Sequence, residues 1–382
     1  MPLSSAQVLI CGAGPAGLAL ACALHDRGLT VRVLEQADET VLAQPPDDGR
    51  EIALTHRSRR LLQGLGLWQR LVDIAPLRRA SVRSSGTRLP LPFAAAGQDL
   101  GWLVSNRQLR AAAWQGARER DVTLCCGRRV VGFERGTLAV RLTTSGGEVH
   151  EAPLVVAADS RFSPLRRLAG IGARYQDFGR SALLVPLEHE ADHGGLAQEC
   201  FLEGHTLALL PMTGRRSSAV WTVANADLPG LMAMGDDRLA AAIEAAAEGR
   251  LGPMRVAGAR HAYPLVAVWA ERFAAPRFAL IGDAAVGMHP VTAHGYNLGL
   301  YGIEALSRRL DAARDPGELG PLMAYEAEQR RAAGPLYAGT NALVRLFTDD
   351  RAPVLALRRA VIDVARRLPP LRAAITRRLV DA

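Results

Sequence analysis

Residues 8–17 read VLICGAGPAG, and this stretch decides the fold. A short apolar run leads into a glycine-rich turn, and the Ala- and Leu-rich residues 18–24 that follow favour a helix. Gly12 permits a tight turn, Gly14 lets the backbone approach a pyrophosphate, and Gly17 lets the helix pack close to the strand. This order of strand, glycine turn and helix predicts a dinucleotide-binding βαβ unit.

Residues 31–34 (VRVL) are expected to form the second strand, which ends at Glu35. At this place in a dinucleotide fold, a carboxylate accepts hydrogen bonds from ribose hydroxyls. The start of the first helix, around Ala16, offers free N–H groups and a partial positive charge to phosphates. The motif does not distinguish NAD from FAD.

Two later segments add information about the cofactor. Residues 158–166 (ADSRFSPLR) follow a buried-strand pattern, and residues 281–300 (IGDAAVGMHPVTAHGYNLGL) follow another. With the N-terminal turn, they resemble the three fingerprints of the single-component aromatic flavoprotein monooxygenases of the p-hydroxybenzoate hydroxylase type. Residues 282–300 are most similar to the ubiquinone-biosynthesis hydroxylases (UbiH/UbiM-like). The resemblance covers roughly residues 5–345.

The resemblance implies an α/β fold: a Rossmann-like FAD-binding domain of the glutathione-reductase type, an inserted β-sheet substrate domain and a helical C-terminus. The expected division assigns residues 1–75, 106–174 and 271–345 to the FAD-binding domain, 76–105 and 175–270 to the substrate domain, and 346–382 to an Arg-rich tail.

The implied activity is that of an FAD-dependent monooxygenase. It would hydroxylate a phenol or quinol in ubiquinone biosynthesis, using NAD(P)H as co-substrate and dioxygen activated as a flavin C4a-hydroperoxide. Two alternatives stay open on the same fold. One is a flavin-dependent reductase of a prenyl or aromatic substrate, which would consume no dioxygen. The other is a non-catalytic flavoprotein scaffold of a biosynthetic complex.

The resemblance also assigns site residues. Asp159 is expected on the ribose side of FAD, and Asp283 is expected to accept from a ribityl hydroxyl. A helix starting near Asn297 would favour the negative charge of reduced flavin. The expected FAD-binding residues are Gly12, Gly14, Ala16, Gly17, Glu35, Arg50, Arg107, Asp159, Asp283, Gly295, Tyr296 and Asn297. The residues expected beside the reacting ring are Pro290, His294 and Gly295.

The sequence departs from the family pattern at two positions. Ser160 replaces the usual glycine, which bears on the nicotinamide more than on the flavin. Val286 stands where many relatives have histidine, so a catalytic imidazole is absent there. Arg166 is expected to face solvent or a phosphate, and His289 is expected to be structural.

Composition excludes several other classes. The chain has 382 residues and a net charge of +8, and all of its 46 basic residues are arginine. The charge is spread along the chain, so it predicts no nucleic-acid-binding face. The five cysteines form no C-x-x-C pair, which argues against a metal site and against disulfides. With no signal-peptide pattern and no apolar run of about 18 residues, a cytoplasmic protein is expected.

Local patterns predict further elements. Helices are expected over residues 52–71, 107–120 and 236–247. The clearest strands of the inserted sheet are expected over 182–187, 205–210 and 219–223.

The C-terminal tail has its own pattern. Its apolar residues fall at helical steps, with arginines among and beside them: Val354, Leu357, Val361, Val364 and Leu368. Such a helix either lies on an anionic membrane surface, peripheral at the inner membrane, or packs on the enzyme body. The first reading suits a prenylated aromatic substrate and contact with other ubiquinone-biosynthesis proteins.

Overall fold

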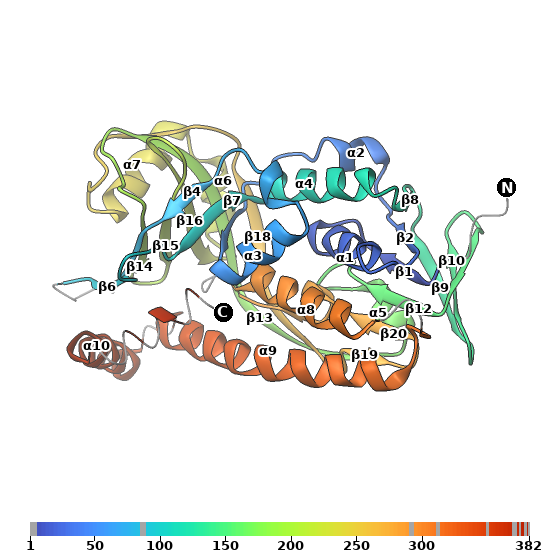
Figure 1. Ribbon diagram of the computed structural model, residues 1–382. Helices are drawn as coiled ribbons and strands as arrows, with labels where there is room; N and C mark the ends of the chain where they lie inside the picture. The colour runs from blue at the N-terminus through green and yellow to red at the C-terminus, as the bar shows by residue number, and fades with distance from the viewer. Residues whose placement is uncertain are drawn as a thin grey trace.

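The computed structural model describes residues 6–84, 89–289, 294–310, 314–348 and 351–368, and also residues 373, 376, 377 and 380. Two sheets organise this part of the chain, and a long C-terminal helix runs along both (Figure 1). Pro290 lies outside the described residues.

The first sheet has six strands in the order β19-β20-β12-β1-β2-β8. Its central strands pair in parallel and consist of buried aliphatic residues, as parallel strands covered on both faces do. The strands are β1 (Val8–Cys11), β2 (Val31–Leu34), β8 (Thr123–Cys125), β12 (Leu154–Ala157), β19 (Ala274–Ala275) and β20 (Phe278–Leu280).

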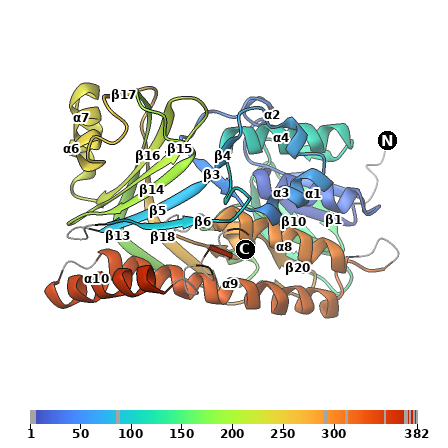
Figure 2. The same ribbon diagram turned by 60° about the vertical axis from the view of Figure 1, so that its left-hand side comes forward.

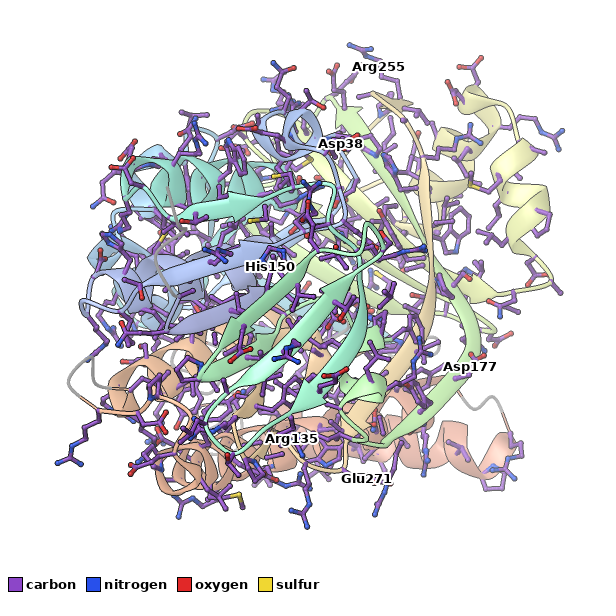
Figure 3. The ribbon with its side chains drawn as sticks, turned by 90° about the vertical axis from the view of Figure 1, so that its right-hand side faces the viewer. Asp38, Arg135, His150, Asp177, Arg255 and Glu271 are labelled. Atoms are coloured by element: carbon purple, nitrogen blue, oxygen red, sulfur yellow. The ribbon has the colours of Figure 1, made fainter. Side chains whose placement is uncertain are left out.

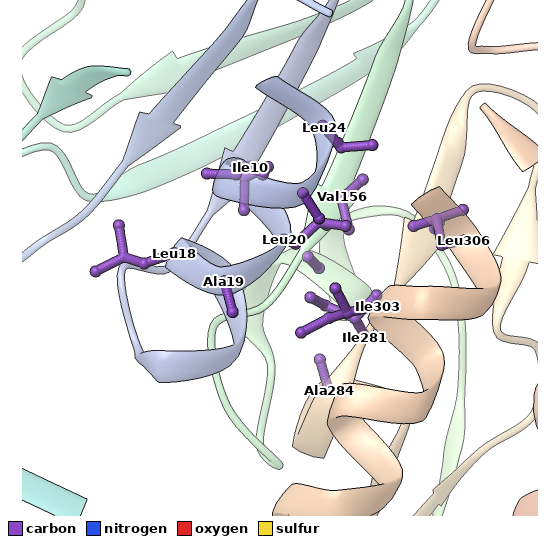
Figure 4. Close-up of a cluster of buried hydrophobic side chains, with 14 of the residues drawn as sticks. Ile10, Leu18, Ala19, Leu20, Leu24, Val156, Ile281, Ala284, Ile303 and Leu306 are labelled. Atoms are coloured by element: carbon purple, nitrogen blue, oxygen red, sulfur yellow. The ribbon is translucent and has the colours of Figure 1, made fainter. Parts of the chain in front are cut away.

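Helices pack on this sheet through apolar faces. Leu20 of α1 (Pro15–His25) lies between Val156 of the sheet and Ile303 of α8 (Gly295–Arg309), and Leu24 belongs to the same buried cluster (Figure 4). The other helices of this part of the chain are α2 (Glu39–Ala43), α3 (His56–Gly64), α4 (Asn106–Glu119) and α5 (Pro164–Leu168), with the 3-10 turns η1 (Trp68–Arg70) and η2 (Gly282–Ala284).

A three-stranded antiparallel sheet extends one side of the molecule. It consists of β9 (Val130–Arg135), β10 (Val140–Thr144) and β11 (Val149–Ala152). Figure 3 views it face on, with Arg135 and His150 labelled.

The second sheet, called the large sheet below, has nine strands in the order β21-β18-β13-β16-β15-β14-β5-β6, with β17 paired to β13. The helices α6 (Leu228–Ala233) and α7 (Asp236–Ala246) lie on one side of it (Figure 2). Its strands are β5 (Arg79–Ser84), β6 (Leu91–Ala94), β13 (Ala173–His189), β14 (Leu196–Phe201), β15 (Thr206–Pro211), β16 (Arg216–Ala224), β17 (Met254–Val256), β18 (His261–Ala270) and β21 (Val286–Gly287).

The last two helices are α9 (Leu319–Thr348) and α10 (Ala352–Arg367). The Tyr325 hydroxyl of α9 donates to the Leu280 carbonyl at 2.6 Å, which fixes α9 against β20. In the described part of the chain, every helix is too short or too polar to span a lipid bilayer.

The predicted fold class, α/β with an inserted sheet and a helical C-terminus, is confirmed. The predicted helix over 52–71 is confirmed only over its middle part, His56–Gly64. That segment forms β3 (Glu51–Leu54), α3 and η1, and β3 joins a small sheet with β7 (Gly101–Ser105) and β4 (Ala75–Leu77). The predicted domain boundaries stay predictions.

Candidate active site

The glycine turn after β1 is closed on one side and open on the other. Gly12 has φ 111°, and a Cβ there would lie 2.4 Å from the Ala158 carbonyl oxygen. A Cβ on Gly17 would lie 2.0 Å from the Gly12 carbonyl oxygen. A Cβ on Gly14 would meet no atom of the described residues within 4 Å. The helix start at Gly14 therefore faces open space, as phosphate binding requires.

Glu35 lies directly over this turn, at the carboxyl end of β2. Its Oε2 accepts from the Ala13 N–H at 2.6 Å, and its Oε1 accepts from the Ala37 N–H at 2.9 Å. The carboxylate is therefore oriented by two backbone donors. It keeps lone pairs for further donors, because each carboxylate oxygen can accept more than one bond.

Asp159 follows β12 and borders the same turn, where a Cβ on Gly12 would lie 2.9 Å from the Asp159 Cα. Its Oδ2 accepts from the Leu165 N–H at 3.2 Å. Its Oδ1 is buried and has no hydrogen-bond partner among the described residues. Burial raises the pKa of this carboxyl above its usual range. An unsatisfied buried acceptor beside the turn fits a ligand that brings a hydroxyl.

Arg161 joins the second motif to the third, a contact that the sequence reasoning missed. Its Nη2 donates to Asp283 Oδ2 at 2.9 Å, and its Nη1 donates to the Val266 carbonyl of β18 at 3.1 Å. The sequence feature that could have indicated this role is the position of Arg161 between Asp159 and Arg166, within the second motif.

Arg166 corrects another expectation, because it is fully buried rather than facing solvent or a phosphate. Its guanidinium donates to the Ala284 carbonyl at 2.6 Å, the Tyr175 hydroxyl at 2.6 Å and the Arg161 carbonyl at 3.2 Å. This arginine thus ties the second motif to the third motif and to the large sheet.

The third motif reaches α8 through residues outside the described ranges, and His294 stands at the N-cap position. Among the described residues, a Cβ on Gly295 would meet nothing within 4 Å. Tyr296 packs against the apolar core, and burial raises the pKa of its phenol. Its backbone N–H, rather than its hydroxyl, is therefore the group available near the helix start.

Asn297 uses its side chain within the protein. Its Oδ1 accepts from the Ser58 hydroxyl at 2.6 Å and from the Thr55 N–H at 3.1 Å, and its Nδ2 donates to the Ala53 carbonyl at 2.7 Å. It therefore holds β3 and α3 against the start of α8.

His289 and Phe178 connect the third motif to the large sheet, with ring centroids 4.9 Å apart. Burial, together with the nearby Arg161, lowers the pKa of His289 to about 4. The imidazole is therefore neutral at pH 7, which agrees with its expected structural role.

The two predicted arginines occupy different settings. Arg50 pairs with Asp48 at 2.6 Å, and its guanidinium lies 5.5 Å from the Tyr263 ring centroid. Asn106 Nδ2 also donates to Asp48 Oδ2, at 2.7 Å. Arg107, the next residue of α4, is exposed.

The three motifs meet at one place, as Gly12 against Ala158 and Arg161 against Asp283 show. A Cβ on Gly282 would lie 3.5 Å from the Ala16 Cβ, which joins the third motif to the first. Two helix starts and three carboxylates converge there, a donor and acceptor set that fits a dinucleotide. Among the described residues, no cluster of three His, Cys, Asp or Glu side chains could hold a metal ion.

A family model described as an FAD binding domain matches residues 5–338. Ubiquinone hydroxylase UbiM of Neisseria meningitidis is 39% identical over 98% of this chain and 84% of that protein. Ubiquinone hydroxylase UbiL of Rhodospirillum rubrum is 40% identical over 96% of this chain and 87% of that protein. The 3-demethoxyubiquinol 3-hydroxylase of Escherichia coli is 30% identical over 94% of this chain and 95% of that protein.

Solved structures share the fold. The p-nitrophenol 4-monooxygenase PnpA of Pseudomonas putida superposes with a TM-score of 0.78 at 17% identity, covering 97% of this chain and 96% of that chain. The tetrameric 2-methyl-3-hydroxypyridine-5-carboxylic acid oxygenase superposes with a TM-score of 0.76 at 20% identity, covering 97% and 98%.

Proposed function

The chain belongs to the FAD-binding monooxygenase family that includes the ubiquinone hydroxylases, and from this premise we propose that it hydroxylates a prenylated phenol or quinol in ubiquinone biosynthesis. The observation that carries the proposal is the convergence of the three motifs beneath the large sheet. Arg161, Arg166 and His289 each link that site to the sheet.

FAD fits the residues present. The open helix start at Gly14 would receive its pyrophosphate, and Glu35 would accept from the adenosine ribose. The unsatisfied Asp159 Oδ1 and the Asp283 carboxylate would accept from its other hydroxyls. The bound flavin supplies the redox and oxygen chemistry, with NAD(P)H as the proposed electron donor.

The protein itself would orient the bound groups, provide a favourable electrostatic environment and exclude water from the site. The start of α8 carries N–H groups and a partial positive charge that favour negative charge. Asn297 fixes β3 against this helix start, and Arg161, Arg166 and His289 link the site to the large sheet. Substrate bound between flavin and sheet would keep water from the reacting groups.

Dioxygen uptake tests the proposed activity. Protein reconstituted with FAD is supplied with NADH or NADPH and a panel of phenols and prenylated quinols, and products are analysed by mass. We expect substrate-dependent uptake and a product one oxygen atom heavier. A protein that holds FAD but reduces a substrate without consuming dioxygen would refute the hydroxylase and leave the flavin site intact.

We further propose that α10 contacts an anionic membrane surface, where a prenylated substrate would reside. Ala365 of α10 packs against Leu91 and Phe93 at the edge of the large sheet. The outward residues Val361, Val364 and Leu368 are exposed by 43%, 51% and 48%. They fall at i, i+3 and i+7, so they form one apolar stripe, and the exposed Arg367 lies beside it.

Sedimentation with phosphatidylglycerol vesicles tests this contact. The triple variant Val361→Ser, Val364→Ser, Leu368→Ser should bind less than the unaltered protein. The matched control replaces Val72, Leu138 and Val149 by serine, since these residues are exposed elsewhere by 89%, 76% and 55%. Equal sedimentation of both variants and the unaltered protein would remove the membrane contact.

A further inference from the structure

The two faces of the large sheet have different coverings. On one face, Leu183, Leu207 and Trp221 cluster with Leu239 and Ile243 of α7. This face is fully packed and belongs to the core between sheet and helix.

The opposite face looks toward the three motifs. Its cluster includes Leu184 and Val220, with Phe178 and Tyr263 packed against them. Phe178 meets the His289 ring, and the Tyr263 hydroxyl donates to the Asp48 carbonyl at 2.9 Å. Both contacts lead from this face to the proposed flavin site.

One row of paired residues crosses this face. Leu184 pairs with Val220 and Val220 with Ala208. Ala208 in turn pairs with Glu199 of β14, and Glu199 pairs with Val82 of β5. Residues that pair directly across a sheet share a face. The Glu199 carboxyl therefore belongs to the face that looks toward the site.

Some side chains at the centre of this face are less deeply buried than those on the α7 side. On the α7 side, Leu207 and Leu209 are at most 2% exposed. On the side facing the site, Val220, Leu210 and Glu199 stay half-buried. Phe201 is the next residue of β14 on this face. It is buried against Leu91 and Phe93 of β6.

Glu199 is the acidic group in this row, which continues from Leu184 to His261 of β18. The Thr206 side chain hydrogen-bonds to it, and burial raises the pKa of its carboxyl to about 8. The Cys200 thiol of β14 is the neighbouring titratable group coupled to Glu199, and among the described residues no arginine or histidine forms an ion pair with this carboxyl. A desolvated carboxyl without a cation is costly unless a polar ligand meets it.

We propose that the Glu199 carboxylate binds the ring hydroxyl of the aromatic substrate and accepts its proton during hydroxylation. This inference rests on the proposed function and names the group that recognises its substrate. The phenolic O–H donates to a Glu199 carboxylate oxygen, the proton moves to that oxygen, and it passes to water when the product leaves. Glu199 exchanges only a proton and forms no covalent bond with the substrate.

The setting suits this transfer. A phenol loses its proton near pH 10, so an ordinary carboxylate with a pKa near 4 is a poor acceptor for it. A carboxyl whose pKa lies near the working pH is a better one. The resulting phenolate carries more electron density on its ring, which is what an electrophilic oxygen attacks.

Ligand discrimination tests the contact without relying on turnover. FAD-loaded protein is titrated with 2-geranylphenol and with its methyl ether, which lacks the hydroxyl, and flavin fluorescence reports binding. We expect the unaltered protein to prefer the phenol by about tenfold, the size of one charge-assisted hydrogen bond. Glu199→Leu should lose that preference. Glu203→Gln, an exposed carboxyl at the end of β14, should keep it.

The pH dependence of turnover provides the second readout. In the unaltered protein, kcat for 2-geranylphenol should rise with pH through about 8, because the ionised Glu199 accepts the proton. Glu199→Gln should be slow and lack this limb, with normal flavin content. An unchanged preference for the phenol in Glu199→Leu would overturn the proposal. Retained preference without oxygen uptake in the unaltered protein would instead overturn the hydroxylase function alone.

Discussion

A single fully buried cation at Arg166 holds the second and third motifs in register. It carries no carboxylate partner among the described residues; its two Nη groups donate to backbone carbonyls and to the Tyr175 hydroxyl instead. The Ala284 carbonyl lies in the interior and cannot turn to water, whereas Tyr175 is exposed by 48%. The guanidinium is therefore a structural crosslink between chain segments that the sequence separates widely.

Replacing Arg166 by methionine should break this crosslink. The change leaves buried carbonyls without donors, and we expect a loss on the order of 3 kcal/mol in the free energy of unfolding. Denaturant titration measures it. Arg167→Met alters the exposed neighbour on α5 and should change stability by less than about 0.5 kcal/mol. Similar losses in both variants would contradict the crosslink.

Asp283 should matter for FAD rather than for the fold. Its Oδ2 pairs with Arg161 at the surface of the site, where both side chains are partly exposed. Asp283→Asn keeps the shape and removes the charge, so FAD affinity should fall about tenfold, as expected for one hydrogen bond to a charged group. Flavin absorbance per protein after dialysis measures this.

Asp121→Asn is the control for that change, because Asp121 is exposed and has φ 52°, a conformation that asparagine also adopts. Flavin content should match that of the unaltered protein. Equal flavin content in the Asp283 variant would show that this carboxylate does not hold the cofactor.

At the scale of elements, the start of α1 combines two glycines with opposite surroundings. Gly17 lies against the Gly12 carbonyl, whereas Gly14 borders open space. Gly17 therefore allows the helix to pack against the strand, and Gly14 leaves space for a ligand at the helix start.

Alanine at each position should separate these roles. Gly17→Ala forces backbone apart and should cost about 1–3 kcal/mol of stability, measured by thermal unfolding of the apoprotein. Gly14→Ala should leave apoprotein stability nearly unchanged, because its φ of −69° suits alanine and its Cβ meets nothing. Its FAD affinity should nevertheless fall at least tenfold. Full FAD binding by the Gly14 variant would place the pyrophosphate elsewhere.

Helices and strands were predictable where the spacing of apolar residues matched the side of the element that is buried. The short runs at 8–11, 31–34 and 154–157 form buried strands as predicted, and the helix expected over 236–247 forms α7. The segment 52–71 misled because its leucines fall at helical spacing. Thr55, as N-cap of α3, starts the helix later than expected, and β3 precedes it. Pairing of Glu51–Leu54 with β7 is a long-range contact that no local pattern shows.

The site was predictable to the same extent. The glycine turn, Glu35, Asp159 and Asp283 follow from motifs whose spacing is local. The Arg161 and Arg166 contacts and the place of Glu199 depend on how strands from distant segments align. The Asn297 side chain forms hydrogen bonds with β3 and with the residue that caps α3. The sequence could not reveal these contacts, because both partners lie more than 200 residues away in the chain.

At the scale of the whole molecule, the junction between β3 and the large sheet carries concentrated charge. Asp73 pairs with Arg216 of β16 at 3.3 Å and also accepts from the Thr213 hydroxyl. Glu51 of β3 lies near this pair. Burial raises the pKa of its carboxyl to about 8, with Asp47, Asp73 and Asp48 raising it further and Arg216 opposing. The two parts of the molecule are thus joined where a carboxyl prefers to stay protonated.

This preference predicts how the stability of the whole fold depends on pH. Between about pH 4.5 and 8 the unfolded chain releases the Glu51 proton while the folded chain keeps it, so the free energy of unfolding falls as pH rises through that window. Glu51→Gln removes this dependence and should be more stable than the unaltered protein by on the order of 1–3 kcal/mol at pH 8.5, but not at pH 4.5. Urea titrations at the two pH values measure the difference, with the exposed Glu134→Gln as control. If Glu51→Gln raises the free energy of unfolding as much at pH 4.5 as at pH 8.5, the gain comes from packing rather than from the charge of Glu51.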